Sequence, residues 1–256
     1  MLVVLTGAEG TIGSGFCQEY LAHYRDAYDL RLAVRAEDFA DDRFGDVVRF
    51  DLGDTASLRE AFRGADCVIS LAANANWQAP WEDLVEPNLV GQVNVFEAAR
   101  LEGVRRVVWA SSVHAIMGHP VDRQVHEHDA PRPDTAYGAT KVFGEALCAA
   151  YAAEHGLSCI ALRIGGYVAP ERLEDLHHSR NPQLLDIVIT QRDMAQLLHR
   201  CVTAPDSVRF EVLHALSDNR YKRMDIGRAR EVVGYAPQDD AFEISVAVEL
   251  GPEEKV

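Results

Sequence analysis

Three residues of the sequence have the types and the spacing that suit proton transfer. Tyr137 and Lys141 are four residues apart, so on a helix their side chains lie on one face, where the ammonium can approach the phenol. A free tyrosine has a pKa of about 10, and a nearby cation stabilises the phenolate and lowers that pKa. Ser112 follows the apolar run 107–110, which predicts a buried strand with a hydroxyl at its carboxyl end. We therefore predict a site of general acid and base chemistry made of these three side chains.

A glycine-rich loop close to the amino terminus gives this site a context. The apolar run 2–5 is followed by Gly7, Gly10 and Gly13 and then by a helical pattern of apolar residues. In a strand, glycine turn and helix of this kind, the glycines permit a tight turn and a close approach of the backbone to a pyrophosphate, and the helix amino terminus offers N–H donors. The pattern predicts a dinucleotide site.

The end of the second strand bears on the choice of dinucleotide. An acid there would bind the ribose 2′-hydroxyl of NAD, but the run 30–35 ends in Val34 and Arg35. An arginine without the acid suits a 2′-phosphate, so we expect NADP or NAD as cofactor, with NADP favoured. The alternative is that Arg35 is a solvated residue and that Asp29 or Asp38 acts as the acid.

The elements that must position these residues alternate along the chain. Helical patterns follow Gly13 and Thr55 and cover 81–102 and 136–155, and they separate apolar, strand-sized runs at 2–5, 30–35, 47–52, 66–71, 104–112 and 157–163. Such alternation predicts an α/β fold with a doubly wound parallel sheet of the Rossmann type.

The carboxy-terminal third is expected to cover the substrate. The pattern weakens from about 165 to 189, and a long irregular segment after a sheet strand is usually functional. Further elements are expected at 193–202, 210–216 and 225–233. We predict a dinucleotide-binding core with the catalytic helix at 1–165 and a substrate-covering segment with carboxy-terminal elements at 166–256, packed on the same domain.

Composition excludes several classes of function. The 256 residues carry 40 acids and 25 bases, and the resulting charge of −15 repels nucleic acids and anionic membranes. The apolar runs are too short for a membrane span, and the start of the chain is expected to be a strand rather than a signal peptide. Five scattered cysteines indicate a reduced cytoplasm, and the ten histidines show no metal-ligand spacing, so we expect no metal.

The chain resembles the extended short-chain dehydrogenase/reductase family, also known as the NAD-dependent epimerase/dehydratase family. The residues that carry the resemblance are Gly7, Gly10, Gly13, Asp51, Asn88, Ser112, Tyr137 and Lys141. Within the family it is similar to the subgroup of uronate dehydrogenase and haloarchaeal glucose-6-phosphate dehydrogenase, on the motifs 110–114, 131–133, 143–145, 163–165, 217–219, 225–230, 234–235 and 237–239. The resemblance implies oxidation of C1 of an aldose or uronate to the lactone.

The resemblance also implies roles for individual residues. Tyr137 would be the base, Lys141 would lower its pKa and hold the nicotinamide ribose, Ser112 would bond the reacting oxygen and Asn88 would hold the active-site backbone. The expected substrate-binding residues are Asn74, Ser112, His114, Gly166 and Arg172, with Arg180 a second candidate for the arginine that binds a uronate carboxylate. The expected cofactor-binding residues are Gly7, Gly10, Thr11, Ile12, Gly13, Arg35, Asp51, Leu52, Leu71, Ala72, Ala73, Tyr137, Lys141 and Ile164.

Other functions remain open from the sequence. A sugar-phosphate 1-dehydrogenase and a nucleotide-sugar epimerase or dehydratase would use the same catalytic residues, although a nucleotide sugar calls for a larger carboxy-terminal lobe. A regulator that senses NADP without catalysis would commonly lack the catalytic tyrosine. By analogy with extended family members, helices 81–102 and 136–155 are expected to form the contact of a homodimer.

Overall fold

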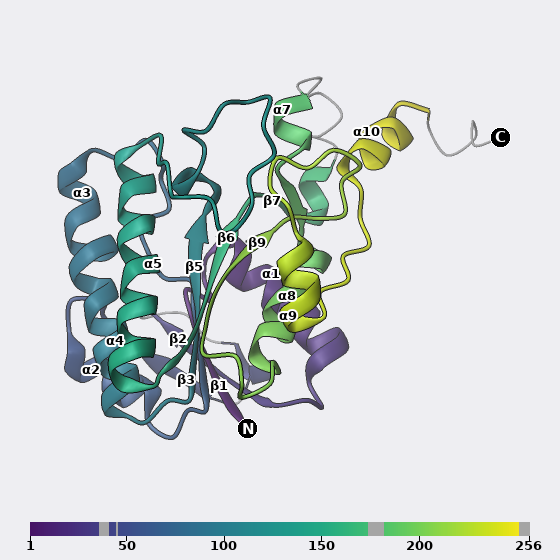
Figure 1. The fold of residues 1–256 in the computed structure, drawn as a ribbon. Helices are drawn as coiled ribbons and strands as arrows, with labels where there is room; N and C mark the ends of the chain where they lie inside the picture. The colour runs from purple at the N-terminus through teal and green to yellow at the C-terminus, as the bar shows by residue number, and fades with distance from the viewer. Residues whose placement is uncertain (36–40, 45, 174–181, 251–256) are drawn as a thin grey trace.

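A parallel sheet forms the centre of the protein, which we describe from a computed structural model (Figure 1). The structure describes residues 1–35, 41–44, 46–173 and 182–250. In these ranges seven strands pair in the order β3-β2-β1-β4-β5-β6-β9, each parallel to its neighbours. Their bounds are β1 (Leu2–Thr6), β2 (Asp29–Val34), β3 (Asp46–Arg49), β4 (Cys67–Ser70), β5 (Arg106–Ser112), β6 (Ser158–Ile164) and β9 (Phe210–Ala215). The doubly wound α/β fold predicted from the sequence is confirmed.

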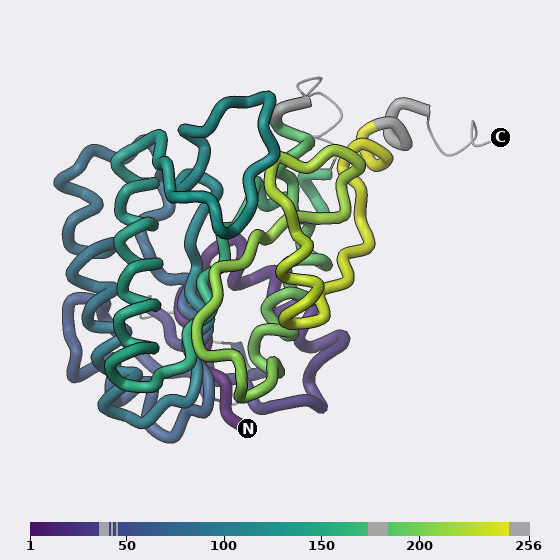
Figure 2. The backbone as a smooth tube through the Cα atoms, viewed as in Figure 1, coloured from purple at the N-terminus to yellow at the C-terminus, as the bar shows by residue number. Residues whose placement is uncertain are grey.

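Helices cover both faces of this sheet (Figures 1 and 2). On one face lie α2 (Thr55–Phe62), α3 (Trp81–Val85), α4 (Gly91–Leu101) and α5 (Ala136–His155). On the other lie α1 (Thr11–Glu19), α8 (Gln191–Val202) and α9 (Gly227–Val233). The expected helix 81–102 is present in three parts, because the π-helical turn η3 (Glu86–Val90) joins α3 to α4. Shorter helical turns are η1 (Tyr20–Tyr24), η2 (Asp42–Phe44) and η4 (Val113–Ala115).

The central strands β1 and β4 are almost entirely apolar because the sheet around them is buried on both faces. Val3 and Leu5 of β1 belong to the apolar core beneath α1 and α8, whereas Val4 between them belongs to the core beneath α2 and α4. Successive side chains of a strand point to opposite faces, so a strand covered on both sides has no position for a solvated residue. This is why the strands read as continuous apolar runs in the sequence.

The segment after β6 is more regular than the sequence indicated. Short strand β7 (Gly166–Val168) pairs in parallel with β8 (Val188–Thr190), and η5 (Pro170–Arg172) and α7 (Pro182–Leu185) lie between them. Strands of three residues are too short to produce a periodic pattern, so the expectation of an irregular segment from 165 to 189 was wrong for these parts. His177, His178 and Arg180 lie outside the described residues, as does Asp38.

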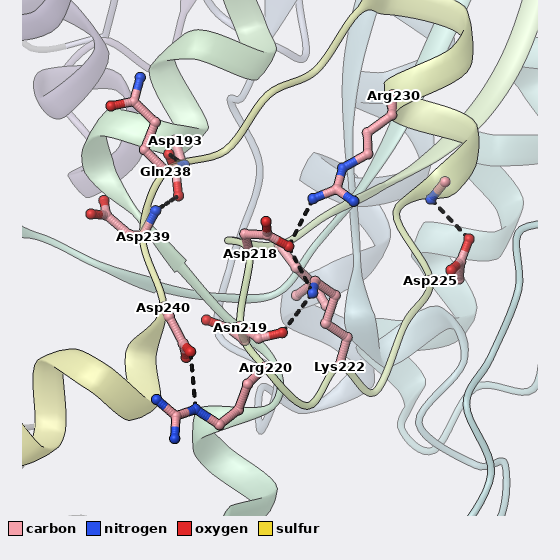
Figure 3. A network of polar contacts seen from close by, with 12 residues as sticks. Asp193, Asp218, Asn219, Arg220, Lys222, Asp225, Arg230, Gln238, Asp239 and Asp240 are labelled. Carbon is pink, nitrogen blue, oxygen red and sulfur yellow. Dashed lines mark hydrogen bonds and ion pairs between the residues drawn. The ribbon is translucent and has the colours of Figure 1, made fainter.

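A polar network ties the chain beyond β9 to the rest of the protein (Figure 3). The carboxylate of Asp193 on α8 accepts the backbone N–H groups of Gln238 and Asp239, at 2.8 and 3.1 Å. Asp218 pairs with Lys222 at 2.8 Å and with Arg230 at 2.7 Å. These contacts lead into α10 (Ala241–Leu250), an apolar helix that the sequence analysis did not predict.

Candidate active site

The glycine loop has the close packing that a pyrophosphate cradle requires. Gly7 has φ +74°, and a Cβ there would meet the backbone N of Ala72 at 2.9 Å. A Cβ on Gly13 would lie 2.2 Å from the carbonyl oxygen of Gly7, so α1 can begin this close to the loop only with glycine. Gly10 is the N-cap of α1, and no side chain caps the helix, which starts with Thr11 and Ile12. The loop therefore fits the pyrophosphate of a dinucleotide, with the amino terminus of α1 as donor.

The loop after β4 lies beside the glycine turn. The N–H of Leu71 donates to the carbonyl oxygen of Thr6 at 3.3 Å, and the N–H of Ala72 donates to the hydroxyl of Thr6 at the same distance. Ala73 and Asn74 follow directly. This arrangement brings the expected cofactor residues 71–73 to the edge of the sheet that holds Gly7.

At the end of β2 the structure places an acid that the sequence analysis did not consider. The carboxylate of Glu9, from the glycine loop, accepts the backbone N–H of Arg35 at 2.8 Å. Asp29 lies at the opposite end of β2, next to Leu2, so the alternative that Asp29 binds the ribose was wrong. The position of Glu9 at the end of β2 depends on a contact between residues 26 positions apart in the chain. The residues around Glu9 in the sequence do not indicate this contact.

Three further cofactor candidates flank this edge of the sheet. Asp51 is exposed two residues beyond β3, and its carboxylate accepts the N–H of Gly53 at 2.8 Å. Leu52 next to it is half-buried, with its carbonyl oxygen accepting the amide of Asn94. Ile164 is the last residue of β6 and pairs with Ser112 across the sheet.

The three predicted proton-transfer residues meet at the carboxyl end of β5. Ser112 is the last residue of β5, and its hydroxyl makes a hydrogen bond with the phenol of Tyr137. The ammonium of Lys141 lies 5.4 Å from the centre of the Tyr137 ring and donates to the carbonyl oxygen of Ala110 at 2.9 Å. All three side chains are at least nine-tenths buried.

Capping and close packing fix the helix that carries two of these residues. The hydroxyl of Thr135 accepts the N–H of Gly138 at 3.0 Å, which starts α5 one residue before Tyr137. A Cβ on Gly138 would lie 2.2 Å from the carbonyl oxygen of His114, and one on Gly144 would lie 2.2 Å from the ring of Trp109. Glycine at both positions lets α5 pack directly on β5.

The pKa of Tyr137 is raised, whereas the sequence predicted that it would be lowered. Burial raises the pKa of Tyr137, and the hydrogen bond with Ser112 lowers it only in part. Burial lowers the pKa of Lys141 to about 8. The expectation of a lowered Tyr137 pKa followed from the charge of Lys141 alone, whereas burial of both groups opposes the ionisation of each.

Asn88 holds backbone segments on both sides of the site. Its amide oxygen accepts the N–H of Asn74 at 2.8 Å, and its amide nitrogen donates to the carbonyl oxygen of Asn74 at 2.9 Å. The same nitrogen lies 3.4 Å from the hydroxyl of Thr140 on α5. Asn88 thus connects the loop after β4 to α5.

The rings of His114 and Trp77 continue outward from Tyr137, and we call these two side chains the aromatic wall. The ring of His114 meets the Tyr137 ring edge-on, with centroids 5.8 Å apart and an angle of 79° between planes. Trp77 stacks on the His114 ring, with the ring centroids 5.3 Å apart and an angle of 12° between the planes. The Nδ1 of His114 lies 2.9 Å from the carboxylate of Asp134. Sequence analysis named His114 but missed Trp77 and Asp134, whose contacts cross 37 and 20 residues of chain.

The remaining substrate candidates lie in different surroundings. The side chain of Asn74 is engaged in its own loop, where it donates to Asp83 and accepts from the N–H of Asn76. Gly166 begins β7 and donates its N–H to the carbonyl oxygen of Ile187 at 2.7 Å. Arg172 is exposed at the end of η5.

A buried ion pair lies directly behind the cluster of Ser112, Tyr137 and Lys141. Glu145 of α5 receives two hydrogen bonds from Arg163 of β6, both 2.8 Å long, and one from the hydroxyl of Ser111 at 2.6 Å. The side chains of Glu145 and Arg163 are 6% and 2% exposed. The buried ring of His214 on β9 lies on the far side of Arg163, at 3.5 Å.

The described part of the chain contains no group of three or more histidine, cysteine, aspartate or glutamate residues that could hold a metal ion. None of its helices combines the length and the apolar character that a membrane crossing requires.

Comparison with known proteins identifies relatives of this chain in sequence and in fold. Residues 3–209 match the model of the NAD dependent epimerase/dehydratase family. The chain is 33% identical to the NAD-dependent glucose-6-phosphate dehydrogenase of Haloferax volcanii, over 95% of each chain. It is also 33% identical to the L-arabinose 1-dehydrogenase (NAD(P)(+)) of the same organism, over 93% of this chain and 97% of the relative. A crystal structure of a uronate dehydrogenase mutant from Agrobacterium tumefaciens complexed with NAD superposes with a TM-score of 0.82, at 26% identity, over 98% of this chain and 90% of that one.

Proposed function

The chain belongs to the NAD dependent epimerase/dehydratase family, and from this premise we propose that it is an NAD(P)-dependent dehydrogenase that oxidises C1 of an aldose or a uronate to the lactone. The observation that carries the proposal is the buried cluster of Ser112, Tyr137 and Lys141 at the edge of the sheet that also holds the glycine cradle. The similarity to dehydrogenases of glucose 6-phosphate and arabinose supports a sugar as substrate.

In this mechanism Tyr137 takes the proton of the C1 hydroxyl. Ser112 binds the same oxygen and holds it beside the phenol, and the ammonium of Lys141 favours the phenolate as it forms. A nicotinamide cofactor bound at this site would supply the acceptor for the hydride of C1. The glycine loop and the amino terminus of α1 would hold the pyrophosphate, and Asn88 keeps the loop after β4 in register with α5.

A panel of sugars tests the proposed reaction. Purified enzyme is mixed with NAD or NADP and with glucose, arabinose, glucuronate, glucose 6-phosphate or UDP-glucose, and the absorbance of reduced nicotinamide is followed. Formation of reduced cofactor with an aldose or a uronate is the expected result. Oxidation of glucose 6-phosphate alone would assign a sugar-phosphate dehydrogenase, conversion of UDP-glucose without net reduction would assign an epimerase, and tight cofactor binding without any turnover would assign a sensor.

The tyrosine is tested by one substitution. Tyr137→Phe removes the phenolic oxygen and should lower kcat by on the order of 10²-fold or more, with the dissociation constant of the cofactor little changed. An undiminished kcat would reject Tyr137 as the base.

We further propose that the enzyme is a cytoplasmic homodimer. The apolar side chains of Val90, Val93 and Phe143 are 37–50% exposed on η3, α4 and α5, the face that the family resemblance assigns to the dimer. All five cysteines are buried and unpaired, which suits a reducing compartment. Light scattering should give a mass of twice that of the protomer, and a measured mass of 28.3 kDa, that of a single chain, would exclude the dimer.

A further inference from the structure

The loop between β4 and α3 holds an aromatic side chain, that of Trp77, one ring away from Tyr137. Asn74 and Asn76 each accept a backbone N–H two residues ahead, at 3.1 and 3.0 Å, and Asn88 binds both backbone groups of Asn74. Trp77 is the central residue of the second turn, and its surface is 49% exposed. The backbone of the loop is therefore ordered by hydrogen bonds, while its largest apolar side chain remains in solvent.

The same loop also contacts the catalytic tyrosine. Ala79, two residues beyond Trp77, packs with Leu84 of α3 against the Tyr137 side chain. Trp77 itself reaches Tyr137 through a single intervening ring, that of His114. An exposed tryptophan fixed at this distance from a reacting group is the kind of apolar surface that ligands cover.

The ring between them is oriented for a hydroxyl. A carboxylate only accepts hydrogen bonds, so the contact with Asp134 places the proton of a neutral His114 on Nδ1 and leaves Nε2 as an acceptor. The wall thus combines an apolar indole face with a hydrogen-bond acceptor beside the phenol. A cyclic sugar has the matching chemistry, since its C–H groups form apolar faces and its hydroxyls surround them.

We propose that Trp77 is the stacking platform for the sugar ring whose C1 Tyr137 deprotonates, with Asp134 holding His114 as the acceptor of a sugar hydroxyl. This inference rests on the proposed function and adds the residue that binds the body of the substrate. No backbone change is needed for this role, because the loop that presents Trp77 is already anchored to Asn88 and α3.

Binding is measured without turnover in the Tyr137→Phe enzyme with saturating NAD. Each sugar that the wild-type enzyme oxidises is titrated in, and tryptophan emission is recorded. Sugar on the indole face should change the emission, and additional Trp77→Phe should remove that change. Trp81→Phe is the matched control, because Trp81 at the start of α3 is 53% exposed and should leave the signal intact.

Kinetics provide the second measurement. Aromatic stacking contributes roughly 0.5–1.5 kcal/mol, so Trp77→Ala should raise KM for the sugar by about three- to tenfold while kcat and the dissociation constant of NAD stay within about twofold. Trp77→Phe should recover part of the loss, and Trp81→Ala should have no effect. An unchanged thermal midpoint for Trp77→Ala would establish that the loop still folds.

Two outcomes would overturn the inference. One is a wild-type KM in Trp77→Ala, and the other is a sugar-dependent emission change that survives Trp77→Phe and disappears with Trp81→Phe. A wild-type enzyme that oxidises no sugar would instead reject the proposed function, so the two failures are distinguishable.

Discussion

The phenol of Tyr137 is subject to opposing effects, because burial raises its pKa and the bond with Ser112 lowers it. Lys141 supplies a cation beside it, and its own pKa of about 8 means that this cation is present at pH 7 and is lost as the pH rises above 8. The proton-transfer site is therefore sensitive to pH through both partners. A kinetic pH profile would report two apparent pKa values that belong to the pair of Tyr137 and Lys141.

Replacement of Lys141 should have an effect that depends on pH. Lys141→Met removes the cation, so kcat/KM should fall most at pH 7, and the ratio of wild type to variant should shrink above pH 8, where the wild-type amine is neutral. Lys222→Met is the control, since Lys222 pairs with Asp218 outside the site. A ratio that is constant from pH 7 to 9.5 would contradict an electrostatic role for Lys141.

Glu9 and Arg35 should act in opposite directions on cofactor choice. The Arg35 guanidinium should attract a 2′-phosphate, and the carboxylate of Glu9, which accepts the backbone N–H of Arg35, should repel one. Glu9→Gln should therefore raise the kcat/KM ratio of NADP to NAD, by about tenfold if the charge contributes about 1.4 kcal/mol, and Arg35→Ala should lower it. Dissociation constants of both cofactors give the same comparison without turnover. A ratio that neither variant changes would exclude both residues from the choice.

The sequence was informative for residues whose role follows from local spacing. Tyr137 and Lys141 share a helix face and Ser112 ends a strand, so their meeting followed from two elements and their order in the sheet. Trp77, Asp134 and Glu9 act through contacts between loops, and nothing in their immediate sequence indicates these contacts. Burial likewise could not be assigned residue by residue, and for this reason the pKa of Tyr137 was expected in the wrong direction.

At the scale of elements, α5 is joined to the sheet by the buried pair of Glu145 and Arg163. The pair lies behind Ser111 and Ser112, so it fixes the helix that carries Tyr137 relative to the strand that carries the serine. Removing one partner of a buried pair leaves an uncompensated charge.

Glu145→Gln should lower the free energy of unfolding by about 3–5 kcal/mol, because Arg163 would keep its charge in a buried position. Urea unfolding followed by circular dichroism measures the loss. Glu97→Gln on α4 is the control, since Glu97 pairs with Arg100 at the surface and the midpoint should hardly move. Equal midpoints for the two variants would show that the buried pair does not stabilise the fold.

Elements of sufficient length were predictable and short ones were not. The six strands from β1 to β6 each contain an apolar run, and the glycine turn and the catalytic helix followed from their patterns. β7 and β8 have three residues each, and their pairing depends on Gly166 meeting Ile187 across the chain. The π-helical turn at 86–90 has no sequence period that separates it from the α-helices on either side.

For the whole molecule, acid stability should depend on a buried histidine. Burial lowers the pKa of His214 to about 3, against about 6.5 in an unfolded chain. Below pH 6.5 the unfolded chain binds a proton that the folded protein excludes, so stability falls by roughly 1.4 kcal/mol per pH unit from this group as the pH drops toward 3. Asp186 has the opposite effect on stability. Its pKa is raised to about 6, so just below that pH the folded protein binds a proton more readily than the unfolded chain does, and stability rises as the pH falls.

His214→Gln should remove this dependence. The variant should be less stable than the parent at pH 7, where the ring is neutral and hydrogen-bonded to Asp225, and the difference should narrow as the pH falls to 5. Unfolding midpoints of the variant and the parent at pH 7 and pH 5 measure this difference in stability. His23→Gln is the control, because the side chain of His23 is 62% exposed. A difference that does not narrow would contradict the assignment.

The position of β9 in the sheet has a consequence for synthesis on the ribosome. Among the described residues, β9 pairs with β6 and forms the edge of the sheet, yet it follows β6 by 46 residues in the chain. When β6 emerges, Arg163 and the catalytic helix are already present, but the edge of β6 stays open until His214 arrives to cover it. An open strand edge promotes aggregation, so heterologous production at low temperature or with a chaperone should raise the yield of native enzyme.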